Sequence, residues 1–526
     1  MPRAGAAESE IVRPAVSGLP GWIESLCLWS ERVWSDPQVP EHRCVANETI
    51  LDGDASAPVV VASECSDSGT RLDGFVVTNG LSDNYGGGIY CKASSPIVAN
   101  CVFSDNTAHE SSGGAIFAEV NSCPTIWSRE LASNTADTDG GAVSTDYDSS
   151  ATIVGCTIVD NTAGAGGGVY AFTPGVLRIW DNVISGNEAT YGDGGGVYAS
   201  SGEAVSVLRN SISGNLAQNG GGVSIDLCDS ATISDNVIEQ NDAVARFGGG
   251  IFLNGCSADE ITISRNVIQG NTASGGYKPE GGGLLIEECH APVLVSANRF
   301  DSNYGYDHGG GIAMHNSQDV TVANNLFARN HVEGGSLLGG GAIHAKSSAP
   351  KIVNNTFIEN WVGTGTWPNI TPAAYGGAIH VRGTPETKII NNVFLNNRAI
   401  YNHGNSVAFT EYGTGSITYC DAFSAVGFTH DNADHGEPGY HYYDYANLVT
   451  PGEGCVLPAG IDPDLCDVAG GHYWLKPTSL LHTQYHGQSH GNDSDVPTTD
   501  IDGFSRESVN QYTDMGAYES DERDCP

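Results

Sequence analysis

The sequence predicts an all-β protein: a right-handed, single-stranded parallel β-helix of about 12 coils with an irregular C-terminal cap. Three observations predict this fold. A Gly-rich motif recurs eleven times, an Asn follows each motif at a nearly constant distance, and apolar residues alternate between the two markers. The expected organisation is an N-terminal segment over 1–48, the β-helix over 49–400 and a cap or tail over 401–526.

The Gly-rich motif reads GGGIY, GGAIF or a close variant of these. Its first glycines are Gly86, Gly113, Gly140, Gly166, Gly194, Gly220, Gly248, Gly281, Gly309, Gly340 and Gly376. The third motif residue lies 18 to 21 residues before the next marker Asn, whereas 7 to 18 residues separate that Asn from the third residue of the next motif. The first segment is therefore expected to be the wall of each coil, and the second a loop that tolerates insertions.

Within the wall segments Val and Ile alternate with other residues at period two, as in SATIVGCTIVDN from Ser150, which is typical of strands. Equivalent strands about 27 residues apart are too distant in sequence to be hairpin partners. They must stack in parallel, one coil on the next, with the right-handed crossover that parallel strands adopt.

Two Asn columns accompany the strands, and both are interpreted as structural. The marker Asn residues, such as Asn215 and Asn303, and a second column five residues earlier, such as Asn210 and Asn298, recur from coil to coil. Asn tolerates a left-handed turn conformation, and its amide can bond to the same Asn one coil away. We expect internal amide ladders rather than catalytic residues.

Composition limits the classes of function. The formal net charge is −40, from 62 acidic and 22 basic residues, so a nucleic acid would be repelled and is not expected as a partner. Clustered Asp makes Ca²⁺ a candidate cation, although no segment has the spacing of an EF-hand. No run of 18 apolar residues occurs, which predicts no transmembrane helix.

Fourteen cysteines are spread along the chain without paired CxxC motifs, which favours disulfides in an oxidising compartment over a zinc site. Register places Cys228, Cys256 and Cys289 at one position in three consecutive coils, so Cys256 is expected to pair with Cys228 or Cys289. Buried thiols filling a core column are the alternative. An extracellular or cell-surface location is expected, although no signal peptide is visible at the start MPRAGAAESE.

The GGAI motifs and FxxN pairs, such as Phe103 to Asn106 and Phe357 to Asn360, resemble the repeats of bacterial polymorphic outer-membrane proteins. More broadly, they resemble right-handed β-helix proteins of the pectate-lyase-like superfamily. The resemblance covers about Thr49 to Ala399 and implies the fold. It leaves function open, because that superfamily includes lyases, hydrolases, epimerases and adhesins.

Both ends of the β-helix need covering, because a terminal coil exposes an unpaired strand edge. Trp22, Leu26, Trp29 and Val33 have helical spacing and predict a short capping helix, with a degenerate first coil as the alternative. Beyond Asn397 the repeats stop, which predicts the irregular C-terminal cap.

In the strand after each Gly motif, alternation places the residues two and four positions past the third motif residue on the outer face. Toward the N-terminal half this predicts an exposed aromatic stripe. Its members are Tyr90, Phe117, Tyr170, Phe172 and Tyr198. Toward the C-terminal end the same alignment predicts an exposed cationic patch. Its members are His315, His344, Lys346, His380 and Arg382.

These two surfaces predict a secreted or surface protein that presents an extended face to an acidic polysaccharide or cell-surface glycan. Cationic groups would bind carboxylates or sulfates, and Tyr170, Phe172 and Tyr198 would bind sugar rings. The alternative is a polysaccharide lyase or related carbohydrate-active enzyme. In that case His344 or Lys346 would be the base, Arg382 would neutralise the uronate carboxylate, and Glu287 would help to hold a cation.

Overall fold

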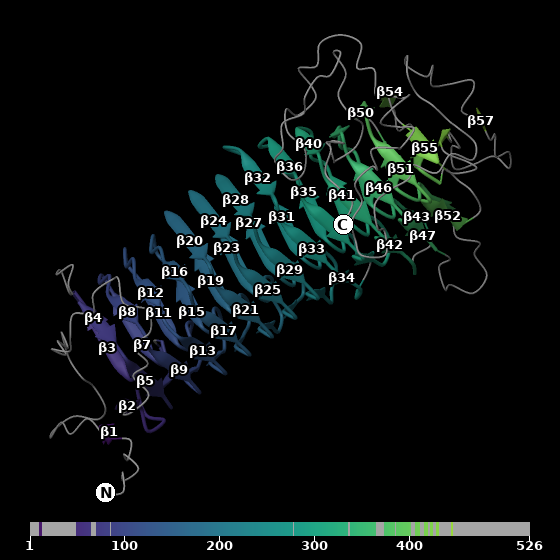
Figure 1. Cartoon of the computed structure of the whole chain (residues 1–526). Coiled ribbons are helices and arrows are strands. Elements are labelled where there is room, and N and C mark those ends of the chain that lie inside the picture. The colour runs from purple at the N-terminus through teal and green to yellow at the C-terminus, as the bar shows by residue number, and fades with distance from the viewer. Residues whose placement is uncertain are drawn as a thin grey trace, which may run out of the picture. The chain divides into compact units, whose positions relative to one another are not determined.

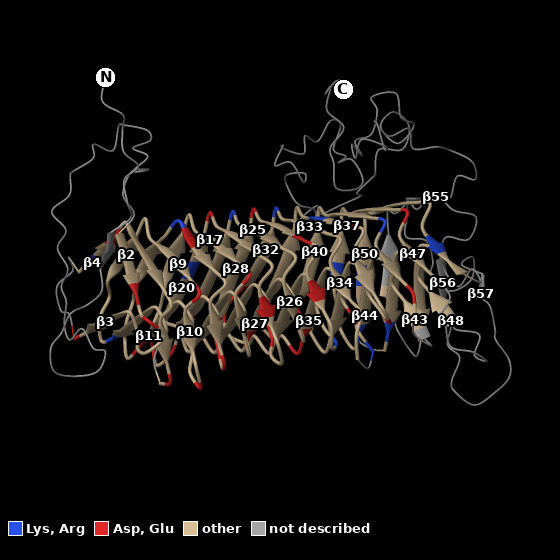
Figure 2. Ribbon diagram, turned by 90° about the horizontal axis from the view of Figure 1, so that it is seen from below, with Lys and Arg blue, Asp and Glu red and all other residues tan. Residues whose placement is uncertain are grey.

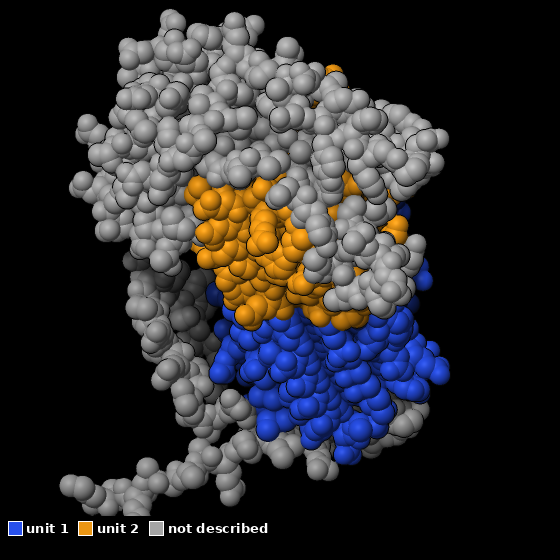
Figure 3. Space-filling view, turned by 90° about the vertical axis from the view of Figure 1, so that its right-hand side faces the viewer, with its two compact units in different colours: residues 1–218, 222–228 blue, residues 219–221, 229–526 orange. Residues whose placement is uncertain are grey.

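The computed structural model describes residues 10–12, 49–64, 70–84, 86–276, 278–334, 337–363, 373–383, 386–400, 405–410, 415–418, 421–423, 428–430 and 443–444. These residues form β-strands and turns, with no α-helix among them (Figure 1). The fold is the predicted parallel β-helix, a solenoid of about 12 turns. The chain divides into two compact units, coloured in Figure 3: Met1–Gln218 with Gly222–Cys228, and Asn219–Gly221 with Asp229–Pro526.

In the first unit four parallel sheets, here named A to D, each take one strand from every coil. Sheet A contains β1 (Glu10–Val12), β2 (Thr49–Asp52), β5 (Phe75–Thr78), β9 (Val102–Ser104), β13 (Glu130–Ala132), β17 (Thr157–Val159), β21 (Val183–Ser185) and β25 (Ser211–Ser213). Sheet B contains β3 (Val60–Ser63), β7 (Ile89–Lys92), β11 (Ile116–Glu119), β15 (Val143–Thr145), β19 (Val169–Phe172), β23 (Val197–Ser200) and β27 (Val223–Asp226). Sheet C contains β4 (Arg71–Asp73), β8 (Ile97–Ala99), β12 (Thr125–Trp127), β16 (Thr152–Val154), β20 (Val176–Trp180) and β24 (Ala204–Leu208). Sheet D contains β6 (Leu81–Ser82), β10 (Thr107–Ala108), β14 (Thr135–Ala136), β18 (Thr162–Ala163), β22 (Glu188–Ala189) and β26 (Leu216–Ala217).

The second unit repeats the same four-sheet plan. Its A strands are β29 (Val237–Glu239), β33 (Val267–Gln269), β37 (Arg299–Asp301), β41 (Leu326–Ala328), β46 (Thr356–Ile358), β51 (Val393–Leu395) and β55 (Asp421–Phe423). Its B strands are β31 (Ile251–Asn254), β35 (Leu284–Glu287), β39 (Ile312–His315), β44 (Ile343–Lys346), β49 (Ile379–Arg382), β53 (Val407–Thr410) and β56 (Phe428–His430), with β57 (Tyr443–Asp444) antiparallel to β56. Its C strands are β28 (Ser230–Ser234), β32 (Ile261–Ser264), β36 (Val293–Ser296), β40 (Val320–Ala323), β45 (Lys351–Val353), β50 (Thr387–Ile390) and β54 (Gly415–Thr418). Its D strands are β30 (Asp242–Ala243), β34 (Thr272–Ala273), β38 (Tyr304–Gly305), β42 (His331–Val332), β47 (Trp361–Val362) and β52 (Arg398–Ala399), and β43 (Leu337–Gly339) pairs separately with β48 (Ala373–Tyr375).

The core inside each unit follows the period-two pattern of the sequence. In β20 and β24 alternate residues are buried, because side chains on one face of a strand point into the coil. In the second unit the FxxN phenylalanines stack in register. Successive ring centroids are 4.9 Å apart along the column Phe300, Phe327, Phe357 and Phe394. Burying such rings stabilises the stacking of neighbouring coils.

The predicted Asn ladders are confirmed. The Nδ2 atom of Asn303 donates to Oδ1 of Asn330 at 2.9 Å and to the carbonyl oxygen of Ile268 at 2.8 Å. The expectation that the ladder Asn itself adopts the left-handed conformation is wrong for most coils. The residue before it does so instead, as at Ser302 (φ 55°) and Arg329 (φ 55°), which leaves the Asn side chain directed into the coil.

The predicted pairing of Cys256 with Cys228 or Cys289 is not found, because no disulfide joins the described cysteines. The three side chains are buried, in agreement with the alternative of a core column. The Sγ atom of Cys256 lies 3.6 Å from the carbonyl oxygen of Asn254, as in a weak hydrogen bond. No described segment forms a helix that is long and apolar enough to cross a membrane. The predicted capping helix around Trp22 and nearly all of the predicted cap over 401–526 lie outside the described residues.

Candidate metal centre

Two columns of side chains in the second unit build a layer on the outer face of sheet B. The outer column consists of the second residue of each B strand. Its members are Phe252, Leu285, Ala313, His344 and His380. The edge column consists of the residue directly before each Gly motif. Its members are Phe247, Glu280, His308, Gly339 and Tyr375, which pair in parallel from coil to coil.

The layer changes character along the unit. At its N-terminal end Phe252, Leu285 and Ala313 form a buried apolar cluster, with Phe247 packed against it. In the coils of Leu285 and Ala313 the edge column already carries Glu280 and His308, and in the next two coils the outer column carries His344 and His380. The same backbone geometry therefore changes from an apolar cluster to a group of imidazoles and a carboxylate.

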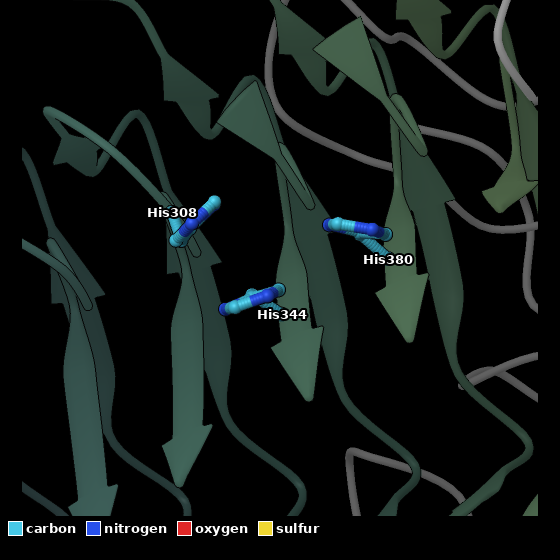
Figure 4. Close-up of side chains that lie close together, drawn as sticks. All are labelled: His308, His344 and His380. Atoms are coloured by element: carbon cyan, nitrogen blue, oxygen red, sulfur yellow. The ribbon is translucent and has the colours of Figure 1, made fainter. Parts of the chain in front are cut away.

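The three histidines lie against one another (Figure 4). Ring centroids are 4.0 Å apart for His308 and His344, 5.0 Å for His344 and His380, and 6.2 Å for His308 and His380. His344 and His380 are register partners on β44 and β49, and His308 comes from the turn that precedes β39. All three are buried, with exposed fractions of 0 to 3 %.

A glycine makes room for this group. A Cβ atom at Gly339 would lie 1.8 Å from Nδ1 of His380, so any side chain in this edge position would displace the imidazole. On its other side the His380 ring is fixed by Nε2, which lies 2.8 Å from Oγ1 of Thr410. The Tyr375 ring stacks on it with centroids 5.3 Å apart. Together these contacts hold Nδ1 of His380 against the position that Gly339 leaves open.

Glu280 and His315 extend the group. Oε2 of Glu280 lies 2.5 Å from Nε2 of His315 and 3.8 Å from Nδ1 of His344. His315 also places Nδ1 4.0 Å from Oε1 of Glu287. Glu280 and His315 are both buried, whereas Glu287 is half-buried.

Several polar atoms of this group lack a hydrogen bond although they are buried. They are Nδ1 of His308, both ring nitrogens of His344, and Nδ1 of His380. A buried polar atom without a partner costs about 1–3 kcal/mol, and such atoms are rare in folded proteins. Four of them in one place indicate a site arranged for a ligand.

The histidines are neutral at physiological pH. Burial lowers the pKa of His308 to about 4, against the opposing effect of the Glu280 carboxylate. Burial also lowers the pKa of His344 and of His380 well below the ordinary value, with a further contribution from neighbouring His308 and Arg382. Neutral imidazole is the form that coordinates a metal ion.

The carboxylates respond in opposite directions. Burial by itself raises the pKa of Glu280, but His308 and His315 outweigh it and the net pKa is lowered, so Glu280 is an anion. Burial and the nearby Glu280 raise the pKa of Asp307 to about 6. The group thus combines neutral nitrogen donors with one fixed negative charge.

Three overlapping sets of donors lie close enough to surround one ion each. They are His308, His344 and His380; Glu280, His315 and His344; and Glu280, Asp307 and His308. Within each set the donor atoms lie within 4.8 Å of one another. Imidazole nitrogen with carboxylate oxygen suits zinc, copper, nickel and iron, whereas Ca²⁺ prefers six to eight oxygen ligands. This cluster is therefore not the type of site expected for Ca²⁺.

The sequence placed some of these residues correctly and misjudged their exposure. The predicted register of His344 with His380 and of Lys346 with Arg382 is confirmed. The expectation of an exposed patch is wrong for His315, His344 and His380, because the edge column covers them. Lys346 is exposed and Arg382 half-buried, and blue segments marking Lys and Arg lie beside β44 in Figure 2. With Glu287, these two form the rim of the cluster rather than its interior.

The aromatic stripe of the first unit is also less exposed than expected. Tyr90 and Phe117 are buried and stack with centroids 6.0 Å apart. Tyr170 and Tyr198 are half-buried and stack at 5.2 Å, and Phe172 remains exposed.

Sequence reasoning missed Glu280, Asp307 and His308. They precede the Gly motif, in segments whose variable length predicts loops. Aligning the residue directly before each motif would have shown Phe247, Glu280, His308 and Gly339 as a column.

The architecture is that of a parallel β-helix repeat protein. Residues 176–369 match the family model described as periplasmic copper-binding protein (NosD), which is less than half of the chain. Residues 100–119 match the Chlamydia polymorphic membrane protein repeat, in agreement with the resemblance of the Gly and FxxN motifs. Together these similarities support a β-helix protein of the periplasm or cell surface. None of the curated proteins and none of the solved structures compared matches the chain.

Proposed function

We propose that this protein binds a divalent transition-metal ion of the copper–zinc group through His308, His344 and His380. The observation that carries the proposal is the convergence of three buried, neutral imidazoles from successive coils, each with at least one ring nitrogen that lacks a hydrogen-bond partner. A bound ion would accept these lone pairs and remove the cost of burying them. The ion would supply a positive charge fixed between the coils.

The donor set favours particular ions. Three imidazoles can occupy three positions of a tetrahedral zinc site, and the order of divalent affinities places copper above zinc for nitrogen ligands. The matched family model is described as a periplasmic copper-binding protein, and most of the cluster lies inside the matched range, with His380 beyond its end. Both points favour copper or zinc over a hard cation.

Burial favours retention of an ion over catalysis. His344 is 0 % exposed and Glu280 is 4 % exposed, so a polymeric substrate would have no access to an ion held there. The expected effect of the ion is to stabilise the second unit, because an ion that binds only the folded state adds its binding free energy to folding.

Glycan binding is a separate prediction with one observation in its favour. Lys346 and Arg382 are register partners at the rim, in a protein with a net charge of −40. An acidic glycan would relieve the repulsion between these two cations. Replacing both by Ala should weaken binding to acidic glycans and leave metal binding unchanged. Unchanged glycan binding would remove this role from the rim.

The metal proposal is tested by titrating the metal-stripped full chain with Zn²⁺ in a calorimeter, and with Co²⁺ as a spectroscopic probe that separates nitrogen from sulfur ligation. The His308→Phe variant should lose Zn²⁺ affinity at least tenfold. The matched control is His331→Phe, since His331 is a half-buried histidine stacked between Tyr304 and Trp361 outside the cluster. Equal affinity in the parent and both variants, or a sulfur-dominated Co²⁺ spectrum, would contradict the proposal.

A further inference from the structure

We infer that the cluster holds two metal ions side by side, the second bound by Glu280 and His315, with His344 shared between the two positions. This inference rests on the proposed function. It adds a second binding position and assigns to His344 the role of a bridge. Each ring nitrogen of a bridging histidine must offer a lone pair, so His344 would bind as the imidazolate, and its ring N–H proton would be released to solvent when the second ion binds. Glu280, His315 and His344 form one of the three donor sets, and His308, His344 and His380 form another.

Two histidines of the outer column, His380 and His344, differ in how their ring nitrogens are satisfied. A histidine that binds a metal through one ring nitrogen nearly always gives the other nitrogen a hydrogen-bond partner, which fixes the ring. His380 follows this pattern, because Nε2 meets Thr410 and Nδ1 faces the cluster. His344 does not follow it, because both of its nitrogens are buried and neither makes a hydrogen bond. One ion would bind one ring nitrogen of His344 and leave the other nitrogen buried without a partner.

Glu280 lies close to both His315 and His344. Its Oε2 atom lies 3.8 Å from Nδ1 of His344 and 2.5 Å from Nε2 of His315. The short contact with His315 is that of an ion pair, and it contributes to the lowered pKa of Glu280. A cation bound by Glu280, His315 and His344 would replace the proton of this pair.

His315 has carboxylates near both ring nitrogens. Its Nδ1 atom lies 4.0 Å from Oε1 of Glu287, which resembles the carboxylate support usual for a metal-binding histidine. Glu280 and Glu287 can offset the charge of a second ion bound beside His315. The first position is built from three imidazoles, so the two sets of ligands differ in charge.

A plain ion pair between Glu280 and His315 is the competing explanation, and metal stoichiometry separates the two. The full chain is stripped of metal and loaded with Zn²⁺, and the ions per chain are counted after gel filtration. The variants His315→Phe and His380→Phe each remove one ligand from one position only. The control is His331→Phe, and thermal unfolding of each variant verifies that it is folded.

The inference predicts that the parent and His331→Phe hold one more Zn²⁺ than either His315→Phe or His380→Phe. His344→Phe, which removes the shared ligand, should hold two fewer. Loss of one ion in His380→Phe with no loss in His315→Phe would overturn the second position and leave the proposed function standing. No loss in any of the three cluster variants would overturn both. Should His315→Phe fail to fold, Glu280→Gln gives the same test of the second position.

Discussion

Two groups of buried polar side chains in the second unit differ in how their hydrogen bonds are satisfied. In the Asn ladder, Asn303 accepts from the backbone and side chain of Asn271 at 3.1 Å and donates to Ile268 and Asn330. In the histidine cluster, His344 is equally buried and makes no hydrogen bond. Both groups recur from coil to coil at fixed positions of the repeat.

The difference shows that burial and repetition do not by themselves distinguish a structural residue from a functional one. Hydrogen bonds within the protein offset the unfavourable free energy of burying a ladder amide. The buried imidazoles lack such bonds, so only a further group can offset the free energy of burying them. Natural proteins keep such costs at functional sites. The ladder therefore stabilises the fold by itself, whereas the cluster needs a further group to offset its burial, as the proposed metal ion would.

The largest expected effect is a loss of stability of the metal-free protein on acidification. The unfolded chain protonates histidine near pH 6.5, whereas burial keeps the folded His308 neutral until about pH 4. Stability is thus present above pH 6.5 and falls toward pH 4, by about 3 kcal/mol for His308 alone. His344 and His380 add to the loss. Asp307 has a raised pKa and takes up a proton more readily in the folded state, so on acidification it offsets a loss of about the size that one histidine causes. Urea unfolding at a series of pH values measures the effect, and a flat profile between pH 7 and 4.5 would show that the buried histidines are not neutral.

The ladder is expected to be almost as sensitive to substitution. Asn303→Leu removes four side-chain hydrogen bonds and leaves backbone and amide groups buried without partners, so it should lower the free energy of unfolding by about 3 kcal/mol. Asp319→Leu, at an exposed position of the same unit, should change it by less than about 0.5 kcal/mol. Equal shifts of the urea midpoint in the two variants would contradict the ladder's role.

A third buried polar group, with charged partners, should give an intermediate effect. Asp301 is 3 % exposed and receives hydrogen bonds from Arg299 and Arg329, which lower its pKa against the effect of burial. Asp301→Ala should cost about 2 kcal/mol, because both guanidinium groups can still reach water. Asp235→Ala, which removes an exposed partner of Arg265, should cost less than about 1 kcal/mol. A reversed order in chemical denaturation would show that burial does not decide the strength of these pairs.

The smallest expected effect is the most discriminating. In the metal-free protein, His344→Phe replaces an unsatisfied buried ring with an apolar one, so the free energy of unfolding should change by less than about 1 kcal/mol or rise. The same kind of replacement in the ladder is strongly destabilising. If His344→Phe costs as much as Asn303→Leu, the cluster is a structural element like the ladder.

The sequence predicted the fold well because the fold is repetitive. The Gly motifs, the period-two strands and the Asn columns each repeat often enough to define register, and the pairing of His344 with His380 follows from that alignment. The left-handed turns were assigned to the ladder Asn instead of the preceding residue, because spacing alone does not separate adjacent positions.

The site is harder to predict from the sequence, because it forms between strands of regular spacing and turns of variable length. Alternation correctly directed His344 away from the coil interior, but exposure depends on what covers that face, and the covering residues Glu280 and His308 lie in turns of variable length. The absence of a side chain at Gly339, which admits His380, becomes meaningful only when the two positions are seen together.

The central claim is that the unsatisfied histidines are balanced by a metal ion, and metal-dependent stability tests it most directly. Urea unfolding of the parent and of His344→Phe is measured with and without Zn²⁺ at about 100 times the dissociation constant of the parent. We expect Zn²⁺ to raise the free energy of unfolding of the parent by about 2.7 kcal/mol per bound ion and to leave His344→Phe unchanged. An equal rise in both proteins, or no rise in the parent, would contradict the claim.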